Sequence, residues 1–503
     1  MDITARDIFL ISPELAMLGL AVVVIGLDLL LRRKGIVIAV AVVGLLVPLV
    51  LGINLWNDVH SSGVDSAFGG ALIVDKFALY FKFLIMVVLA MLFLASAEYS
   101  TRFHPNQAEF FGLMLFSATG LMLLPAAGDL ITLYISLELA SLPLIALVAY
   151  TKTRLRSTEA GVKYLVLSAI SSAVLLYGFA FLYGATGTLQ LVSTDPADPA
   201  IGHMLAAGGD LSIPFGSIPV LVGAVLATAG FGFKLSMVPF QMWTPDVYEG
   251  APTPIAAFLA VASKAAAFAI LLRLFYVGLE PVGADWSLMF AVLAAITMTV
   301  GNVVAIGQAN IKRLLGYSTI AQAGYLLVGV AAFADRSREA ADGALGIEAV
   351  LFYLGGYAVM NLAAFFAVIA ITDKTGDDTI NGLAGMGRRS PVLAAILTFA
   401  LLSLTGIPPT VGFMGKLFIF NAAVNADLVW LAVIGVLNSV LSAYYYVGVI
   451  RVMYLRDPSD DTRISVAIPL WSALGVAAAG VLAFGLWPTV LLDIAKEAAL
   501  NLR

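Results

Sequence analysis

Long apolar segments, separated by short polar stretches, run along the whole chain. Windows of about 18 or more apolar residues recur, and charged residues or Pro- and Gly-rich stretches divide them. The pattern predicts about 14 membrane-spanning helices, which begin near residues 12, 35, 76, 107, 129, 160, 217, 252, 284, 313, 345, 391, 427 and 464. We therefore expect an all-α, polytopic membrane protein.

Two of the expected spans are interrupted near their middles. The seventh contains Gly232 and Pro239, and the twelfth contains Gly406, Pro408 and Pro409. Proline removes a backbone hydrogen bond and clashes with the preceding turn, so both helices should break here. Lipid tolerates such a break only where protein or a water-filled cavity covers it.

The interrupted spans occupy corresponding places in two groups of five. Spans 4–8 and spans 9–13 each carry the interruption in their fourth member. A unit with an odd number of spans repeats with inverted topology, and paired interrupted spans mark the ion site of such transporters. We predict two inverted five-helix repeats (107–280 and 281–456) within a single membrane domain (1–503), preceded by spans 1–3 (1–106) and followed by span 14 (457–503).

Four ionisable side chains lie well inside the apolar segments: Glu138, Lys234, Lys264 and Lys416. An ionised group near the centre of a bilayer costs roughly 2.5–17 kcal/mol, so such residues are seldom without a function. They are candidates for moving charge across the membrane. The alternative is structural: Glu138 and Lys234 form an ion pair, and the other lysines bind exposed backbone carbonyls.

Other polar positions fit the membrane interface. Lys163 lies near a basic loop, four residues after Glu159, so the two can form an ion pair on one helix face. Lys82 and Asp28 fall near the ends of spans and are expected at the interface. The run Tyr444–Tyr446 is more typical of an aromatic belt than of a quinone site.

Composition excludes several kinds of site. Hydrophobic residues make up 61% of the chain and charged residues 12%, against about 25% charged in an average soluble protein. The net charge is −5 and the basic residues cluster at segment ends, which gives no surface for nucleic acid. The chain has no cysteine, and its three histidines lie in connecting stretches, so we expect no metal site, haem or iron–sulfur cluster in it.

The connecting stretches bear on topology and on catalysis. The longest, roughly 184–216, has no apolar pattern that could form a core of its own, so no soluble catalytic domain is expected. The N-terminus lacks the features of a cleaved signal, so the first apolar segment is expected to remain as a span. Both termini are predicted on the outer side, because most basic residues then fall in inner loops.

The basic residues assigned to the inner loops are Arg32, Arg33, Lys34, Arg102, Lys152, Arg154, Arg156, Lys312, Arg313, Lys374, Arg388, Arg389, Arg451, Arg456 and Arg463. The outer loops and termini hold only Arg6, Arg336, Arg338, Lys496 and Arg503.

Several long motifs carry a family resemblance. They read FKLSMVPFQMWTPDVYEGAPTP, AVASKAAAFA, IKRLLGYSTIAQAGY, LTGIPPTVGFMGKLFIF and SAYYYVGVIRVMY. From about residue 70 to 455 the chain resembles the antiporter-like membrane subunits of proton-pumping NADH:quinone oxidoreductase, respiratory complex I. The stretch EAGVKYLVLSAISSAVLLYG most resembles subunit N. Lys416 stands where subunit M relatives have glutamate, and the long lateral helix of subunit L relatives is missing.

The resemblance implies roles for the buried residues. Glu138 would pair with Lys234, Lys264 would be the central proton relay, and Lys416 would be the terminal site. Lys163 would lie near the proton-input route.

Two glutamines depart from the family pattern. Gln241 and Gln322 stand where many relatives have histidine. Glutamine donates and accepts hydrogen bonds but does not titrate near neutral pH, so these residues could organise water without holding a proton.

The resemblance also implies partners. No cofactor is expected in this chain, and flavin, iron–sulfur clusters and quinone are expected in partner subunits. The partners would be a neighbouring antiporter-like subunit and small membrane subunits in the bacterial cytoplasmic (inner) membrane, with both termini periplasmic. Two alternatives remain open: a subunit of a multisubunit sodium/proton antiporter, and a static membrane scaffold.

Overall fold

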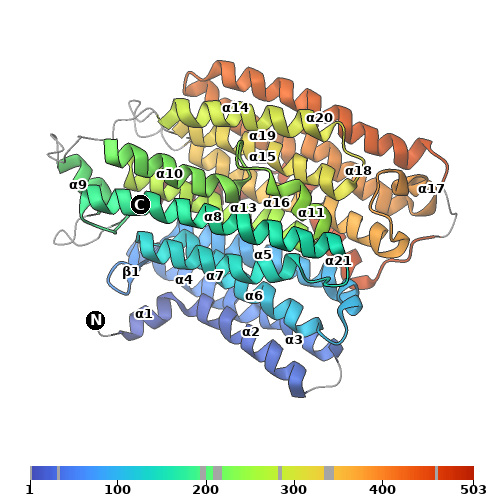
Figure 1. Cartoon of the computed structure of the whole chain (residues 1–503), viewed down its shortest axis with the longest axis horizontal. Coiled ribbons are helices and arrows are strands. Elements are labelled where there is room, and N and C mark those ends of the chain that lie inside the picture. Colours follow the sequence, from blue (N-terminus) through green and yellow to red (C-terminus); the bar gives the residue numbers. More distant parts are fainter. Residues whose placement is uncertain are drawn as a thin grey trace.

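The computed structural model describes residues 3–30, 34–192, 200–207, 218–280, 286–333, 345–458 and 463–502. Its helices lie side by side along the long axis of the molecule (Figure 1). The strands β1 (Asp65–Ala67) and β2 (Leu72–Val74) form an antiparallel hairpin at one end of the bundle.

The helices are, in chain order, α1 (Ala5–Leu10), α2 (Ser12–Leu30), α3 (Lys34–Gly44), α4 (Leu46–Ser62), α5 (Lys76–Tyr99), η1 (Ser100–Phe103), α6 (Gln107–Leu123), η2 (Leu124–Ala126), α7 (Leu130–Val148), α8 (Leu155–Thr186), α9 (Ile201–Ala207), α10 (Ile218–Leu235), α11 (Trp243–Gly250), α12 (Thr253–Phe258), η3 (Leu259–Ser263), α13 (Lys264–Arg273), η4 (Leu274–Gly278), α14 (Trp286–Ala305), α15 (Ile311–Phe333), α16 (Leu345–Thr375), η6 (Asn381–Leu383), α17 (Met386–Arg389), α18 (Pro391–Thr405), α19 (Val411–Asn425), α20 (Val429–Leu455), α21 (Ile468–Leu486) and α22 (Thr489–Leu500).

The number of spans agrees with the sequence pattern. Within the described ranges, 13 helices are long and apolar enough to cross a membrane. The shorter apolar helices α18 and α19 together make one further, interrupted span. The spans begin within a few residues of the predicted positions, and the all-α polytopic fold is confirmed. Of the expected long loop, 193–199 and 208–217 lie outside the described residues.

The two interrupted spans break with the same backbone geometry. Helix α10 ends at Leu235 and helix α18 at Thr405. The next residue has positive φ in both cases, 60° at Ser236 and 93° at Gly406. The residue after that donates its N–H to the carbonyl five positions earlier, at 2.9 Å in the first break and 3.1 Å in the second. The prediction that spans 7 and 12 break is confirmed.

The second span of each repeat begins with a matching helix cap. Asp129 caps α7 by accepting two backbone N–H bonds, and Asn310 caps α15 in the same way. Each capping residue also pairs with a returning strand-like segment, Asp129 with Gln190 and Asn310 with Thr379. The same local architecture is therefore built twice.

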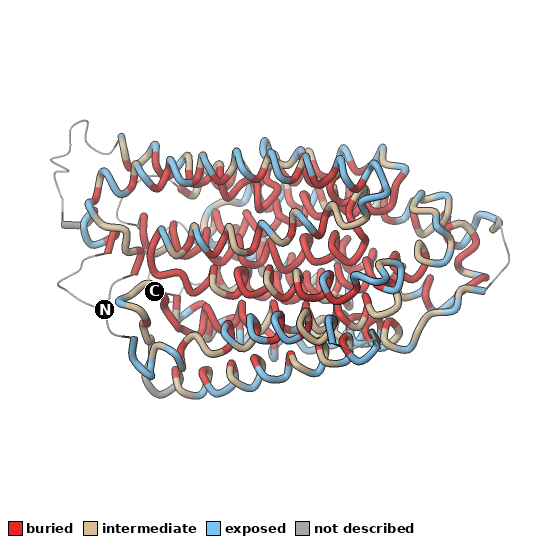
Figure 2. The backbone as a smooth tube through the Cα atoms, turned by 60° about the horizontal axis from the view of Figure 1, so that its bottom comes forward, coloured by how far each residue is buried: buried red, intermediate tan, exposed pale blue. Residues whose placement is uncertain are grey.

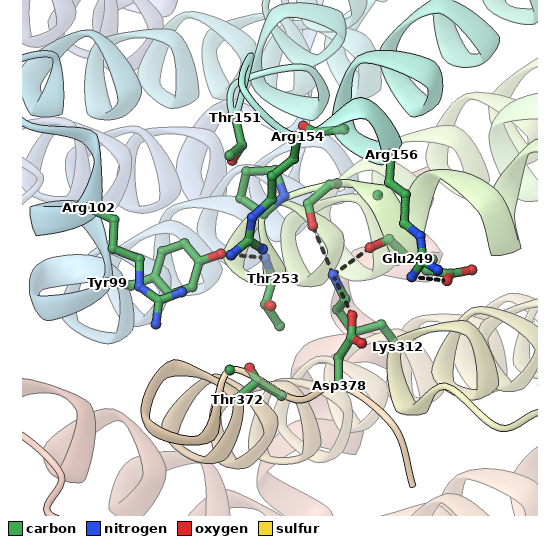
Figure 3. A pocket seen from close by; sticks show the side chains of 15 residues that line it. Tyr99, Arg102, Thr151, Arg154, Arg156, Glu249, Thr253, Lys312, Thr372 and Asp378 are labelled. Carbon is green, nitrogen blue, oxygen red and sulfur yellow. Dashed lines mark hydrogen bonds and ion pairs between the residues drawn. The ribbon is translucent and has the colours of Figure 1, made fainter. Parts of the chain in front are cut away.

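The two copies run in opposite directions. Thr151 follows the end of α7, whereas Lys312 lies at the start of α15, and both line one cavity at the same end of the bundle (Figure 3). The end of span 5 thus meets the beginning of span 10. This is the inverted topology that the odd number of spans per repeat predicts.

The centre of the bundle is span 8, made of α12, η3, α13 and η4. Every residue in the most apolar window of this span is buried, whereas the spans nearest the N- and C-termini are largely exposed at the bundle surface (Figure 2). Segments η3 and η4 are π-helical, and Lys264 directly follows the first of them. Single π-turns often mark functional positions in helices. Nothing in the sequence pattern predicted them.

Basic residues from different loops that the sequence assigns to the inner side lie at one end of the bundle. Arg102 pairs with Asp373 at 2.6 Å, and Arg388 pairs with Asp457 at 3.1 Å. The N- and C-termini lie at the opposite end (Figure 1). The loops that carry these residues and the two termini thus lie at opposite ends of the bundle, and the side of the membrane that each end faces stays a prediction. Arg32, Arg33, Arg336 and Arg338 lie outside the described residues.

Two buried ion pairs tie helices together away from the repeats' breaks. Lys82 Nζ lies 2.7 Å from Glu14 Oε1, and both side chains are buried, so the interfacial position expected for Lys82 is wrong. Arg273 donates to both carboxylate oxygens of Asp75, at 3.1 and 2.8 Å, and neither side chain is exposed. The sequence could not indicate these pairs, because the partners come from distant helices.

The Arg273–Asp75 pair gives a stability prediction. Arg273→Met leaves a buried, unpaired carboxylate, so we expect the folded chain to lose about 3–5 kcal/mol. Thermal unfolding of the purified protein in detergent measures the loss. The double variant Arg273→Met/Asp75→Asn removes both charges and should recover most of it; equal melting temperatures for the single variant and the wild type would contradict the prediction.

Candidate functional site

Lys234 lies at the end of α10, two residues before the break in span 7. Its ammonium donates to Ser141 Oγ at 2.7 Å and to Ser168 Oγ at 3.2 Å. The ring of Tyr164 lies 5.4 Å from Nζ, at cation–π distance. No carboxylate contacts this lysine within the described ranges. The side chain is nevertheless buried, with only 6% exposed.

Glu138 lies on α7, one turn before Ser141 and on the same face. Its Oε1 is buried and has no hydrogen-bond partner among the residues that the structure describes. The resemblance implied that Glu138 pairs with Lys234, but the two side chains do not contact each other directly. The Lys234 ammonium donates to Ser141 instead, although the Glu138 carboxylate is near enough to attract Lys234 electrostatically.

Lys264 lies at the centre of the bundle, where α13 begins. Its ammonium donates to the main-chain carbonyl of Thr319 on α15, at 2.8 Å. The side chain is 1% exposed, and no carboxylate reaches it in the described part of the chain. The lysine therefore has a neutral oxygen as its ligand.

Lys416 lies on α19, after the break in span 12. Its ammonium donates to the carbonyls of Leu404 and Thr405, at 3.1 and 2.8 Å, and to Ser439 Oγ at 3.1 Å. The last carbonyls of a helix have no partner within that helix and carry the negative end of its dipole. The end of α18 thus supplies two of the three oxygens that Lys416 contacts, and Ser439 on α20 supplies the third. The ring of Tyr325 lies 4.2 Å from Nζ.

Helix α15 connects Lys264 to Lys416. Gln322 lies one turn after Thr319, and its amide donates to Leu404 O at 3.0 Å, the same carbonyl that Lys416 contacts. The hydroxyl of Tyr353 donates to the Gln322 carbonyl oxygen. Gln322 is therefore fixed at both ends of its amide between the two lysines.

A further polar cluster lies beside Lys416 on α14, α15 and α20. Tyr446 and Ser318 share a hydrogen bond of 2.5 Å, and Tyr445 donates to Asn302 Oδ1 at 3.0 Å. Both tyrosines are buried, whereas Tyr444 is exposed. The aromatic-belt interpretation is therefore wrong for Tyr445 and Tyr446. Consecutive tyrosines on a helix point to different faces, which the sequence run alone did not resolve.

A small cavity separates Lys234 from the Lys264 segment. It has a volume of about 20 Å³ and is lined by Ser141, Lys234 and Ser263, among others. Ser263 directly precedes Lys264. A cavity of this size holds about one water molecule. Gln241 lies in the break of span 7, and its Oε1 is buried without a partner in the described chain.

Lys163 lies apart from the row of buried lysines. Its ammonium contacts Glu159 Oε1 and Asp246 Oδ2, each at 2.7 Å, and the side chain is 41% exposed. Arg313 donates to the other oxygen of Asp246 at 2.5 Å. The ion pair with Glu159 agrees with the sequence spacing. Asp246 links α8 to α15 at the end of the bundle opposite to the chain termini.

The described residues contain no group of three or more His, Cys, Asp and Glu side chains that could hold a metal ion.

Comparison with known proteins places the chain in a family. The model of the family "NADH:quinone oxidoreductase/Mrp antiporter, TM" matches residues 127–442, a range that contains Glu138, Lys234, Lys264 and Lys416. The chain belongs to this family.

Two relatives resemble the chain over almost its whole length. NADH-quinone oxidoreductase subunit N from Dehalococcoides mccartyi is 42% identical over 498 residues, covering 98% of this chain and 99% of the relative. A chain of respiratory complex I from Thermus thermophilus is 30% identical, with a TM-score of 0.76, covering 96% of this chain and 98% of that one. The resemblance seen in the motifs is confirmed.

The Mrp complex from Dietzia sp. DQ12-45-1b contains a chain with the same fold. Its TM-score is 0.82, and the alignment covers 99% of this chain and 98% of that one. The sequence identity is 23%, so this likeness concerns the fold alone.

Asp246 gives a prediction about pH. Burial raises the pKa of Asp246, but hydrogen bonds from Lys163 and Arg313 outweigh it and hold this pKa below the usual 3.8. A carboxyl group whose pKa is lower in the folded state stabilises the fold above its unfolded pKa, and this contribution disappears as the pH falls through the folded value.

We therefore expect Asp246→Asn to lower the melting temperature at pH 7. The difference in melting temperature from the wild type should shrink as the pH falls below 3.8, the usual pKa of this carboxyl group. Melting curves of both proteins across this range test it. A difference that is constant with pH would mean that the charge of Asp246 contributes nothing.

Proposed function

We propose that this chain is the proton-translocating subunit N of an NADH:quinone oxidoreductase, with Glu138, Lys234, Lys264 and Lys416 as proton stations. Quinone reduction takes place elsewhere in the complex. The chain itself binds no redox cofactor in this proposal; flavin, iron–sulfur clusters and quinone belong to partner subunits. The two five-helix repeats, 107–280 and 281–456, each contribute one interrupted helix to the path.

One observation carries the proposal: Lys234, Lys264 and Lys416 have neutral oxygens as their only hydrogen-bond acceptors in the described chain. Burial disfavours the charged form of a lysine, and a neighbouring carboxylate favours it. Lys82, by contrast, is paired with the carboxylate of Glu14. A lysine bound only by hydroxyls and carbonyls has both protonation states available, as a relay requires.

Glu138 gives the path its means of control. Its carboxylate lies one turn from Ser141, which now holds the Lys234 ammonium. A movement that brings Glu138 into contact would favour the charged lysine, and a movement away would favour release of its proton. Moving one charge against the membrane potential takes about 2.3 kcal/mol per 100 mV, which such a change in pairing can supply.

Beyond Lys234, the path runs toward the second repeat. The small cavity between Ser141 and Ser263 supports water-mediated transfer from Lys234 to Lys264. Thr319 and Gln322 on α15 lead from Lys264 to Lys416. Gln241 and Gln322 orient hydrogen bonds in this proposal and do not hold protons.

The wider context follows from the same proposal. The partners are other membrane subunits of the complex, among them a neighbouring antiporter-like subunit. The membrane is the bacterial cytoplasmic membrane, with both termini on the periplasmic side. Lys163 belongs to the ion cluster at the inner end and lies at the input of protons in this proposal.

A sodium/proton antiporter subunit is the second candidate, favoured only by the fold shared with the Mrp chain. Copurification with flavin and iron–sulfur subunits separates the two candidates, since an antiporter complex would lack both. A static scaffold is a third reading, and the Lys264 variant below addresses it.

Lys234→Ala tests the proton station in the assembled complex in sealed vesicles. We expect quinone reduction and proton uptake to fall together by about tenfold or more, because a proton relay typically contributes a factor of that order. Lys374→Ala is the control: this lysine pairs with Glu98 at the bundle surface, and both activities should stay near wild type. Unchanged activities in Lys234→Ala, with assembly intact, would mean that Lys234 is structural.

Lys264→Ala tests conduction through the centre. Pumping should fail although the complex assembles, since no other titratable ligand is bound to Thr319 O in the described chain. Native electrophoresis checks assembly and a pH-sensitive dye reports proton uptake. Normal pumping in this variant would favour the scaffold.

A further inference from the structure

A polar cavity of about 200 Å³ opens at the end of the bundle opposite to the chain termini. Its walls come from the end of α5, the α7–α8 connection, the α11–α12 turn, the start of α15 and the end of α16. Four cations from separate segments line it: Arg102, Arg154, Arg156 and Lys312 (Figure 3). The proton stations proposed above do not line this cavity.

The lining carries an excess of positive charge. Its four cations stand against two carboxylates, Glu249 and Asp378, which leaves two positive charges over. Glu249 is also shared with Arg313, which lies outside the lining, at 3.2 Å. Three of the lining cations contact a carboxylate, and the pairs are Arg102–Asp373, Arg156–Glu249 and Lys312–Asp378.

Arg154 differs from the other three cations. Its guanidinium contacts no carboxylate and no other hydrogen-bond acceptor among the residues that the structure describes. The side chain points into the cavity, toward Tyr99 and Thr253 (Figure 3). Lys312 is near enough to repel it electrostatically. A guanidinium has five N–H donors, and those of Arg154 are therefore available to a ligand in the cavity.

Two further groups of donors belong to the same wall. Tyr99 is buried, with 8% exposed, and its hydroxyl accepts from the N–H of Thr253 at 3.4 Å, so its own proton remains for another acceptor. Helix α8 begins at the cavity, where Arg156 and Ser157 of its first turn line the wall. The residue at its N-cap, Arg154, provides no side-chain cap. The first N–H groups of α8 thus add to the positive potential.

These donors match the chemistry of a phosphate group. Guanidinium binds phosphate oxygens in a bidentate manner, and the N-terminus of a helix binds the same oxygens through its N–H groups. A phosphate also supplies more than one negative charge, as the lining requires. The cavity is several times the roughly 30 Å³ that one water molecule occupies in the liquid, so a group of five heavy atoms has room.

We propose that this cavity binds a phosphate group, with Arg154 as its main ligand. Tyr99 and the start of α8 donate to the same group, and the other lining cations contribute charge. The proposal goes beyond the proposed function, because it involves no proton station and holds whether or not the lysines conduct. Inorganic phosphate and the headgroup of an anionic phospholipid are two sources of this chemistry. A phosphate bound here joins α8 to α15 and α16, so it should stabilise the folded bundle.

The first test is equilibrium dialysis of the purified full chain in detergent against radiolabelled inorganic phosphate, at constant ionic strength. We expect saturable binding of one phosphate per chain. Arg154→Gln should weaken the binding by about tenfold or more, because a hydrogen bond to a charged group contributes a factor of that order. Arg154→Lys keeps the charge but loses the planar fork, so its affinity should lie between those of the wild type and Arg154→Gln.

Arg388→Gln is the matched control. Arg388 is an exposed arginine of the basic loops, pairs with Asp457 at 3.1 Å and does not line the cavity. Its phosphate binding should equal that of the wild type. Because Arg154 has no partner in the described chain, Arg154→Gln should keep the wild-type melting temperature in phosphate-free buffer, which separates loss of the ligand from loss of the fold.

The second test separates the two sources of the phosphate. The chain is placed in nanodiscs of phosphatidylcholine, with or without phosphatidylglycerol, and melted with and without inorganic phosphate. If the ligand is a lipid headgroup, phosphatidylglycerol should raise the melting temperature of the wild type but not of Arg154→Gln. If the ligand is the free ion, inorganic phosphate should raise it equally in both kinds of nanodisc, and again only when Arg154 is present.

Two results would overturn the proposal. One is the absence of saturable phosphate binding together with no effect of phosphatidylglycerol on the melting temperature. The other is phosphate binding by Arg154→Gln that equals the wild type, since Arg154 would then not be the ligand.

Discussion

Inside a bilayer there is no water to form a hydrogen bond with an unpaired backbone carbonyl or N–H, and the structure depends on this constraint. The interrupted spans expose such groups at their breaks. At the second break, the free carbonyls of Leu404 and Thr405 are satisfied by the ammonium of Lys416. The free helix end and the buried charge would each be unstable in lipid, and here they satisfy each other. The carbonyl of Leu404 also accepts a hydrogen bond from Gln322, which extends the contact.

Among the buried cations of the described residues, two groups differ in the partners of their charges. Lys82 and Arg273 contact carboxylates and hold helices together. Lys234, Lys264 and Lys416 contact hydroxyls and carbonyls. Removing the charge of Lys82 or Arg273 leaves an unpaired carboxylate. The hydroxyls and carbonyls that bind the other three lysines stay neutral whether the lysine is protonated or not. Burial alone would not have separated the two groups.

The sequence predicted the fold and the buried lysines well, because both depend on local patterns. Apolar length located the spans, and proline with glycine located the breaks at Ser236 and Gly406. It failed where distant segments meet. The position of Lys82 needed Glu14 from another helix, and the inward positions of Tyr445 and Tyr446 needed the rotation of α20. The cavity around Arg154 carried no signal at all, since its lining comes from separate segments that only the fold brings together.

The matching turns at the two breaks have a consequence for direction. Lys234 lies two residues before the positive-φ residue of its turn, whereas Lys416 lies ten residues after the equivalent residue of the other. The backbone is duplicated but the charge is not. Two chemically identical halves related by inversion would conduct equally well either way. Here the symmetry of the chain is broken at its charges, so the molecule has an intrinsic polarity, and a duplicated architecture can act as a one-way device.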